Sequence, residues 1–142
     1  NMAYNSDSTV HRVGYMFLAF SHLTDGEVDK KELGTLAGIL WAYLEAWEQD
    51  LTGDGVVDLD DAIKLIDNDL IPYYNAQDDD SRIQHFSQTV NMLKAQDWWN
   101  DDFANMLLKQ LKMVADADGH YHDNEKEWIR ITADRFGVSA PA

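Results

Sequence analysis

Apolar residues recur every three to four positions through most of this chain, a period typical of amphipathic helices. In the first expected helix, for example, Val13, Phe17 and Phe20 fall on one face. The expected helices span residues 8–23, 30–49, 59–71, 81–96, 100–115 and 123–136. Pro72 is expected to end the third helix, and residues 73–80 to form a polar connection, because proline interrupts the helical hydrogen-bond ladder. The pattern predicts an all-α protein, a compact bundle of about six helices forming a single domain over residues 1–142.

Three of the expected helix junctions share one motif: Asp-Gly, an apolar residue two places after the glycine, and an acid six places after it. The motif runs from Asp25 to Glu32, from Asp54 to Asp61 and from Asp118 to Glu125. This repetition predicts two pseudo-repeats built from αα-hairpins. Helix capping explains the motif without any ion, since the glycine ends one helix and the acid closes a capping box at the start of the next.

The middle junction contains a complete calcium-type loop over residues 50–61. Its expected ligands, at loop positions one, three, five, seven, nine and twelve, are Asp50, Thr52, Asp54, the carbonyl of Val56, Asp58 and Asp61. Gly55 takes position six, where an EF-hand loop turns sharply, and Val57 takes the apolar position eight. Because Ca²⁺ takes six to eight oxygens at this spacing, the loop predicts a calcium site.

The twelfth position departs from the commonest EF-hand pattern. Asp61 stands where a longer glutamate usually supplies two oxygens, and in this respect the loop resembles the dockerin-like branch of EF-hand loops. The shorter side chain also fits a tighter, six-coordinate site that accepts Mg²⁺. Trp47, one helical turn before Asp50, is expected to report any movement of the helix entering the loop.

The two outer junctions are incomplete versions of this loop. At positions one and three, the first junction has Ser21 and Leu23, and the last has Val114 and Asp116. Both are weaker candidates for metal binding. Their candidate ligands are Asp25 and Glu32 in the first junction and Asp116, Asp118 and Glu125 in the last.

The outer junctions also resemble the two acidic signatures of the tellurite-resistance TerB-like family. The resemblance lies in residues 23–32 and 115–125, and residues 128–138 are similar to that family's closing helix. It implies a compact helical bundle of two pseudo-repeats, with Asp25, Glu32, Asp118 and Glu125 as the metal-binding acids. It also implies a role in metal or chemical stress, or as an accessory module. A complete EF-hand loop between the halves is not part of that family's pattern.

The charge of the chain limits the kinds of partner that it is expected to bind. With 26 acidic and 11 basic residues, the net charge is −15, which would repel nucleic acid and anionic membranes and favours cations or a basic protein surface. The chain has no cysteine, which excludes disulfides and thiolate metal sites. No apolar run approaches the roughly 18 residues of a membrane span, and no signal peptide is visible, so we expect a cytoplasmic protein.

Two alternatives to a simple cation-binding protein stay open. An EF-hand calcium sensor would expose an apolar groove to a partner helix when the ion binds. A metal-dependent enzyme would use His120 and His122 with the neighbouring acids, a weak signal without a third imidazole. His11, His22 and His85 are scattered and are expected at the surface or at helix ends. Because no nucleophile–base pattern or phosphate loop is visible, we do not expect an enzyme.

Overall fold

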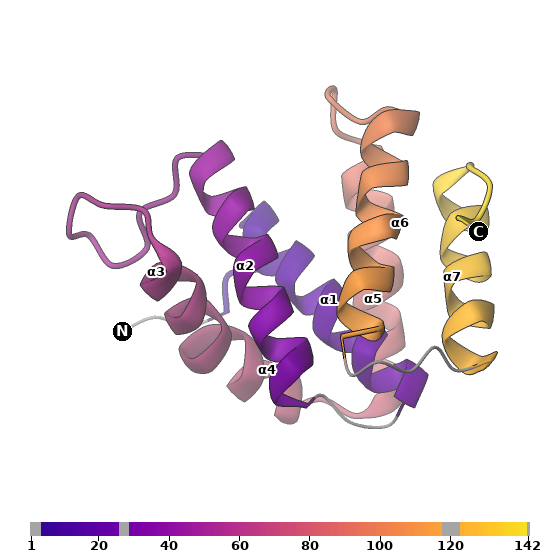
Figure 1. The fold of residues 1–142 in the computed structure, drawn as a ribbon, viewed down its shortest axis with the longest axis horizontal. Coiled ribbons are helices and arrows are strands. Elements are labelled where there is room, and N and C mark those ends of the chain that lie inside the picture. Colours follow the sequence, from indigo (N-terminus) through magenta and orange to yellow (C-terminus); the bar gives the residue numbers. More distant parts are fainter. Residues whose placement is uncertain (1–3, 26–28, 118–122, 142) are drawn as a thin grey trace.

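The computed structural model describes residues 4–25, 29–117 and 123–141. Its elements are α1 (Thr9–Asp25), α2 (Lys30–Ala46), α3 (Leu59–Lys64), the π-helix η1 (Leu65–Leu70), α4 (Ile71–Asn75), α5 (Asp79–Lys94), α6 (Asp101–Ala115) and α7 (Asp123–Phe136). No strand occurs within these ranges. The predicted all-α bundle is confirmed, and α3, η1 and α4 follow one another so closely that they form one rod (Figure 1).

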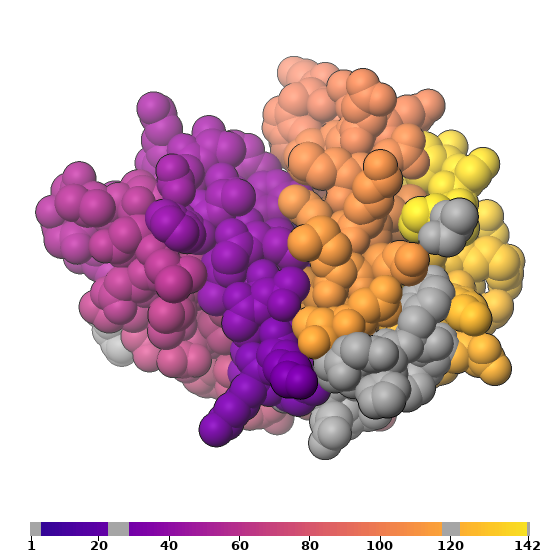
Figure 2. All heavy atoms as spheres, in the orientation of Figure 1, coloured from indigo at the N-terminus to yellow at the C-terminus, as the bar shows by residue number. Residues whose placement is uncertain are grey.

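Helix α1 lies at the centre of the bundle and packs against α2, η1, α5, α6 and α7. The sequence suggested one apolar face, but every residue from 13 to 21 is buried. A helix that neighbours surround on all sides is apolar all round, which explains the difference. The space-filling view shows α2, the loop and α3 on one side of the molecule, and α6 and α7 on the other (Figure 2).

The predicted end of the third helix before Pro72 is wrong. The helix continues to Asn75, and the expected polar connection shrinks to residues 76–78. A π-turn precedes the proline, with the N–H of Ile71 donating to the carbonyl of Ile66 five residues back. In this wider turn the hydrogen bond spans five residues in place of four. The helical hydrogen-bond pattern is therefore already shifted at the point where Pro72 would otherwise interrupt it. Tyr74, placed in the connection by the sequence, is only 5% exposed, and its burial favours the longer helix.

One glycine sets the distance between α1 and this rod. A Cβ atom at Gly14 would lie 2.5 Å from Cδ1 of Leu70 and 3.3 Å from Cδ1 of Leu40. All three positions belong to the packed interior, so a larger residue at position 14 would push the helices apart. The close approach brings η1, and with it the end of the α3 rod, against the central helix.

Candidate metal centre

The loop between α2 and α3 has the backbone that a calcium-type loop requires. Gly53 and Gly55 have φ angles of 75° and 85°, in the left-handed region that favours glycine. Gly55 is the residue that the sequence pattern assigned to the sharp turn. Asp58 then starts α3 as its N-cap and forms a reciprocal capping box with Asp61. The exit from the loop is therefore fixed by the helix that follows.

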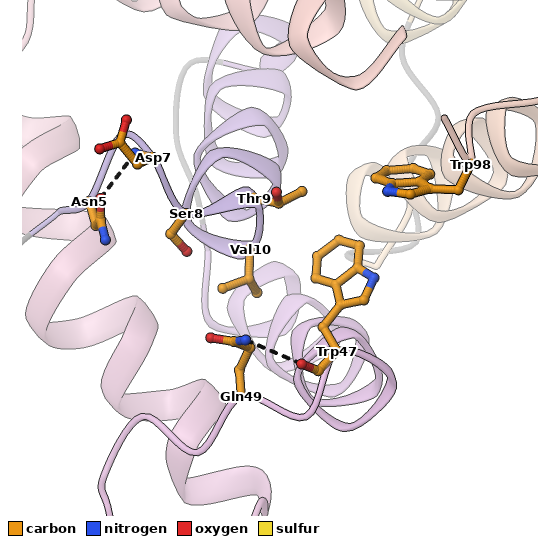
Figure 3. Close-up of a pocket in the computed structure, with 8 residues that line it drawn as sticks. All are labelled: Asn5, Asp7, Ser8, Thr9, Val10, Trp47, Gln49 and Trp98. Carbon is orange, nitrogen blue, oxygen red and sulfur yellow. Dashed lines mark hydrogen bonds between the residues drawn. The ribbon is translucent and has the colours of Figure 1, made fainter. Parts of the chain in front are cut away.

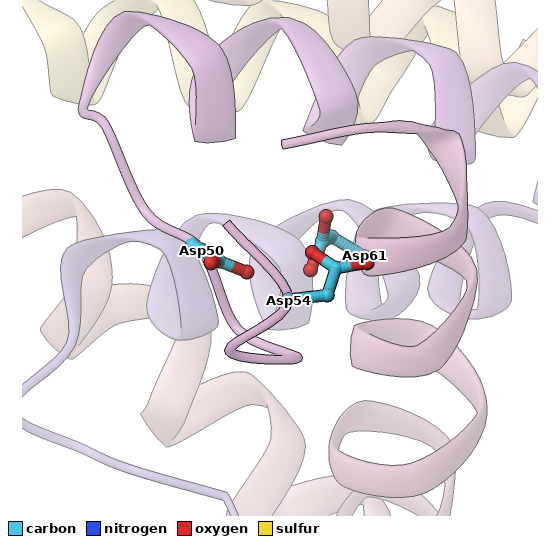
Figure 4. A group of neighbouring side chains, drawn as sticks. All are labelled: Asp50, Asp54 and Asp61. Carbon is cyan, nitrogen blue, oxygen red and sulfur yellow. The ribbon is translucent and has the colours of Figure 1, made fainter. Parts of the chain in front are cut away.

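Three carboxylates from this loop converge on one point. Oxygen atoms of Asp50, Asp54 and Asp61 all lie within 4.8 Å of one another, and Figure 4 shows the three side chains turned toward each other. They occupy loop positions one, five and twelve. Asp61 is fully buried, whereas Asp54 is exposed, so the cluster reaches from the protein interior to solvent. Like charges this close repel one another unless donors or a cation compensate.

Backbone N–H groups hold the Asp50 carboxylate in place. Its Oδ1 accepts from the N–H of Gly53 at 2.9 Å, and its Oδ2 accepts from the N–H of Gly55 at 2.7 Å. The hydroxyl of Thr52 donates to Oδ1 at 3.3 Å. Hydrogen bonds to an ionised acceptor are among the stronger ones in proteins. The loop thus wraps around its first acid and orients it before any ion arrives.

Asp61 is held from two sides. Its Oδ1 accepts from the N–H of Thr52 at 3.0 Å, and its Oδ2 accepts from the N–H of Asp58 at 2.9 Å. Burial alone would raise the pKa of Asp61, but the hydrogen bonds from Asp58 and Thr52 outweigh it and lower the pKa below its ordinary value. The carboxylate is therefore ionised at neutral pH. Each of its oxygens retains a second lone pair that a cation can use.

The other predicted ligands lie differently around the cluster. Asp58 is outside the group of three, and its Oδ1 accepts from the N–H of Asp61 as the helix cap. The N–H of Val56, at loop position seven, donates to Oδ1 of Asp54 at 3.0 Å. Asp58, which could serve as a cap or as a ligand on sequence grounds, acts here as a cap. EF-hand loops often fill position nine through a water molecule, which is compatible with this arrangement.

The described parts of the outer junctions contain two buried acids. Glu32 and Glu125 are fully buried, like Asp61, and all three stand six places after the glycine of their motif. Glu32 forms a capping box with Asp29, in which the N–H of Glu32 donates at 2.8 Å and that of Asp29 at 3.1 Å. Asp116 is the C-cap residue of α6. The predicted residues Asp118, His120 and His122, and the side chain of Asp25, lie outside what the structure describes.

The sequence did not single out Trp41, which lies next to the loop. Its indole N–H donates to the carbonyl of Val57 at 3.4 Å, so the side chain links α2 to the loop from outside. Trp47, the expected reporter, instead packs near Tyr43 and Trp98, with ring centroids at 5.0 and 6.1 Å. No feature of the sequence separates these two tryptophans, because the contact depends on how the loop folds back.

Of the two places expected for His11, the surface or a helix end, the structure shows the second: His11 lies in the first turn of α1, but it is buried. It is 5% exposed, with Nε2 at 2.8 Å from Oδ2 of Asp69 and Nδ1 at 2.7 Å from Oγ of Ser8. Asp69 belongs to η1 and is 2% exposed. The pair therefore joins the start of α1 to the π-helix. The two residues are 58 positions apart, so the sequence pattern gave no signal of their contact.

A cavity of about 440 Å³ lies beside the start of α1 (Figure 3). It is lined by Asn5, Asp7, Ser8, Thr9, Val10, Trp47, Gln49 and Trp98. The indoles of Trp47 and Trp98 lie on one side and Asn5 and Asp7 on the other. Most of the lining groups are neutral, and they offer no set of charged groups comparable to that in the loop.

Within the described ranges, no helix combines the length and the apolar character that crossing a bilayer requires. Comparison with protein-family models, with curated proteins and with solved structures finds no match to this chain. The resemblance of the outer junctions to TerB-like proteins therefore stays a prediction, and the geometry of the loop is the main indication of a function.

Proposed function

We propose that this chain is a non-enzymatic, divalent-cation-binding helical protein that holds one Ca²⁺ in the loop of residues 50–61. The observation that carries the proposal is the convergence of Asp50, Asp54 and Asp61 within 4.8 Å at loop positions one, five and twelve. Hard cations such as Ca²⁺ prefer oxygen ligands in this arrangement. The carbonyl of Val56 and the hydroxyl of Thr52 would add neutral oxygens.

The electrostatics of the loop favour a bound cation. Three carboxylates concentrate negative charge, and the loop N–H groups compensate only part of it. A divalent ion among the three acids would neutralise two of these charges without displacing the N–H donors, since each carboxylate oxygen can accept more than one partner. The flexible coordination of Ca²⁺ suits a loop whose acids range from buried Asp61 to exposed Asp54, and Mg²⁺ would require a more regular octahedron.

The ion would have a structural role. It would tie the segment that follows α2, through Asp50, to the first turn of α3, through Asp61. These two helices pack against each other, so the ion would stabilise an existing interface. A role in metal or chemical stress, or as an accessory module, is supported only by the resemblance of the outer motifs to TerB-like proteins.

Calorimetric titration of chelator-stripped protein with Ca²⁺ and with Mg²⁺ tests this proposal. We expect one Ca²⁺ per chain, and loss of that binding in the double variant Asp50→Ala/Asp54→Ala. The double variant Asp101→Ala/Asp102→Ala is the matched control, because it removes two exposed acids from the first turn of α6, remote in sequence from the loop. Unchanged stoichiometry and affinity in the loop variant would show that the ion binds elsewhere.

A further inference from the structure

A small cavity lies where the end of α1 meets α4 and α5. It encloses about 270 Å³, slightly less than the roughly 300 to 1,000 Å³ of sites for drug-sized ligands, so it suits a molecule of few atoms. We call it the α1–α4 cavity. None of its described lining residues belongs to the calcium-type loop, and none is an acid. The lining that matters for binding is Leu18 and His22 of α1, Leu33 of α2, Ile71 and Tyr74 of α4, and Arg82 of α5.

Two polar groups of the lining residues are buried without a hydrogen-bond partner. They are the hydroxyl of Tyr74 and Nδ1 of His22, and neither has a partner among the described residues. Tyr74 is 5% exposed, and the His22 ring meets its ring edge-on, with centroids at 5.5 Å. Most buried polar groups in folded proteins are hydrogen-bonded, because burial without a partner is costly. Two such groups beside one cavity are therefore available to a ligand.

Arg82 adds a positive charge to the same cavity. Its Nε and Nη2 donate to the carbonyl of Tyr74 at 3.3 and 3.0 Å, and its Nη1 donates to Asp79 at 3.0 Å. These bonds use three of the five N–H groups of a guanidinium. The side chain of Arg82 is 13% exposed and that of Asp79 is 70% exposed. Because exposed ion pairs contribute little, a second carboxylate can compete for the guanidinium.

These groups select the charge of the ligand. Burial raises the pKa of Tyr74 to about 12, so its hydroxyl stays protonated and can donate at neutral pH. Arg82 has only donors, and His22 donates from Nδ1 in one of its two tautomers. A carboxylate accepts from all of these groups, whereas a cation would meet a like charge. The net charge of −15 opposes anions at long range, but this effect falls off over about 8 Å at physiological salt.

The apolar part of the lining selects the rest of the ligand. Leu18, Leu33 and Ile71 provide aliphatic side chains from three different helices. A short hydrocarbon chain would bury its surface against them, and an inorganic anion would not. The cavity therefore combines donors for a carboxylate with walls for an aliphatic chain.

We propose that the α1–α4 cavity binds a small aliphatic carboxylate. Its carboxylate would accept from Arg82 and from the hydroxyl of Tyr74, and its chain would lie against Leu18, Leu33 and Ile71. The continuation of the helix past Pro72 would then have a second purpose, because it places Tyr74 in the cavity wall. None of these residues is a proposed cation ligand, so the site is separate from the calcium loop.

Three probes separate the two halves of this proposal on the full chain. The compound 3-methylbutanoate has the carboxylate and the chain, 3-methylbutanol has the chain alone, and inorganic sulfate has the charge alone. NMR titration with Ca²⁺ at a fixed concentration, in about 150 mM salt, follows the Nε–H signal of Arg82. We expect 3-methylbutanoate to saturate with a dissociation constant of about 1 mM, since so small a ligand gains limited free energy. The other two probes should bind roughly tenfold or more weakly.

The discriminating variant is Tyr74→Phe, which removes only the hydroxyl. Because that hydroxyl has no partner among the described residues, the variant should melt at the same or a higher temperature. It should nevertheless bind 3-methylbutanoate roughly fivefold or more weakly. Tyr43→Phe is the matched control: Tyr43 is also 5% exposed, but its hydroxyl donates to Oε1 of Gln110 and does not line the cavity. This control should melt at a lower temperature and bind like the unaltered protein.

Four results would each overturn the proposal. The first is no saturation by 3-methylbutanoate at tenfold the expected dissociation constant. The second is equal affinity for 3-methylbutanol, which would reduce the site to an apolar hollow. The third is equal affinity for sulfate, which would reduce it to charge attraction. The fourth is unchanged affinity in Tyr74→Phe, which would place the carboxylate elsewhere on the chain.

Discussion

Removal of the ion should weaken the fold by an amount that follows from the loop geometry. Three carboxylates lie within 4.8 Å of one another. Even at the dielectric constant of water, each pair at that distance repels by about 0.9 kcal/mol, so the three pairs contribute about 3 kcal/mol. A bound Ca²⁺ cancels this repulsion. Mass action gives a similar figure, about 2.7 to 4.1 kcal/mol when free Ca²⁺ is 100 to 1,000 times the dissociation constant.

Urea unfolding in chelator and in millimolar Ca²⁺ measures this difference. We expect the free energy of unfolding to fall by about 2 to 4 kcal/mol when Ca²⁺ is removed. In a thermal scan this corresponds to a melting temperature lower by about 10 °C for a domain of this size. The N–H groups of Gly53 and Gly55 that hold Asp50 should keep the loop partly ordered without the ion.

The variant Asp54→Asn separates charge repulsion from other causes. Its amide oxygen can still accept the N–H of Val56, so the local hydrogen bond is retained while two of the three repulsive pairs disappear. In chelator this variant should be more stable than the unaltered protein, by up to about 1 kcal/mol after salt screening. In Ca²⁺ it should be less stable. Equal stability of the unaltered protein in chelator and in Ca²⁺ would refute the reasoning.

The same assay in chelator should show the titration of Asp61. Hydrogen bonds lower its pKa in the folded state, so its contribution to stability is present above the ordinary aspartate pKa of about 4. The contribution is lost as the pH falls through the lower, folded-state pKa. The stability difference between the unaltered protein and Asp61→Asn should therefore be largest near neutral pH and shrink below about pH 4. A difference that grows on acidification would contradict the assignment.

Three further predictions concern residues around and beyond the loop. Excitation of tryptophan should sensitise the luminescence of Tb³⁺ bound in the loop. Trp41→Phe should abolish most of that signal whereas Trp98→Phe should not, because Trp41 donates a hydrogen bond to the loop. The variants Glu32→Gln and Glu125→Gln should each lose less than about 1 kcal/mol in urea unfolding, because glutamine can still cap the helix. Both should keep the strong calcium site in calorimetry. Disappearance of a second bound ion in Glu125→Gln would instead assign metal binding to the last junction. Asp69→Ala should cost about 1 to 3 kcal/mol in urea unfolding by leaving Nε2 of buried His11 without this hydrogen-bond partner, and Asp69→Asn, whose side chain can still pair with that nitrogen, should cost less. A loss below about 0.5 kcal/mol in Asp69→Ala would show that the contact contributes little to stability.

The helices could be predicted because local periodicity carries most of the signal. Five of the six expected segments match observed helices to within a few residues. The end predicted for the third segment, before Pro72, was wrong. Proline does disfavour a continuous helix, but the burial of Tyr74 and a π-turn allowed the helix to continue past it. A tertiary contact overrode a local preference at that point.

The candidate site, like the helices, could be predicted only where local spacing determines the contacts. The spacing of Asp50, Asp54 and Asp61 was visible in the sequence, because a loop of fixed length determines which residues can meet. Sequence spacing did not reveal whether Asp58 acts as a cap or as a ligand, since both roles require the same position. The contact of Trp41 with the loop depends on how separate segments pack together, and local spacing does not encode it.

The most direct test is to locate the ion in crystals grown with Ca²⁺. We expect one ion at about 2.3 to 2.6 Å from carboxylate oxygens of Asp50, Asp54 and Asp61, with the carbonyl of Val56 completing part of the shell. Anomalous scattering from Tb³⁺ exchanged into the same crystals should peak at that position. A loop without an ion in crystals that hold Ca²⁺ at another place on the chain would contradict the central claim.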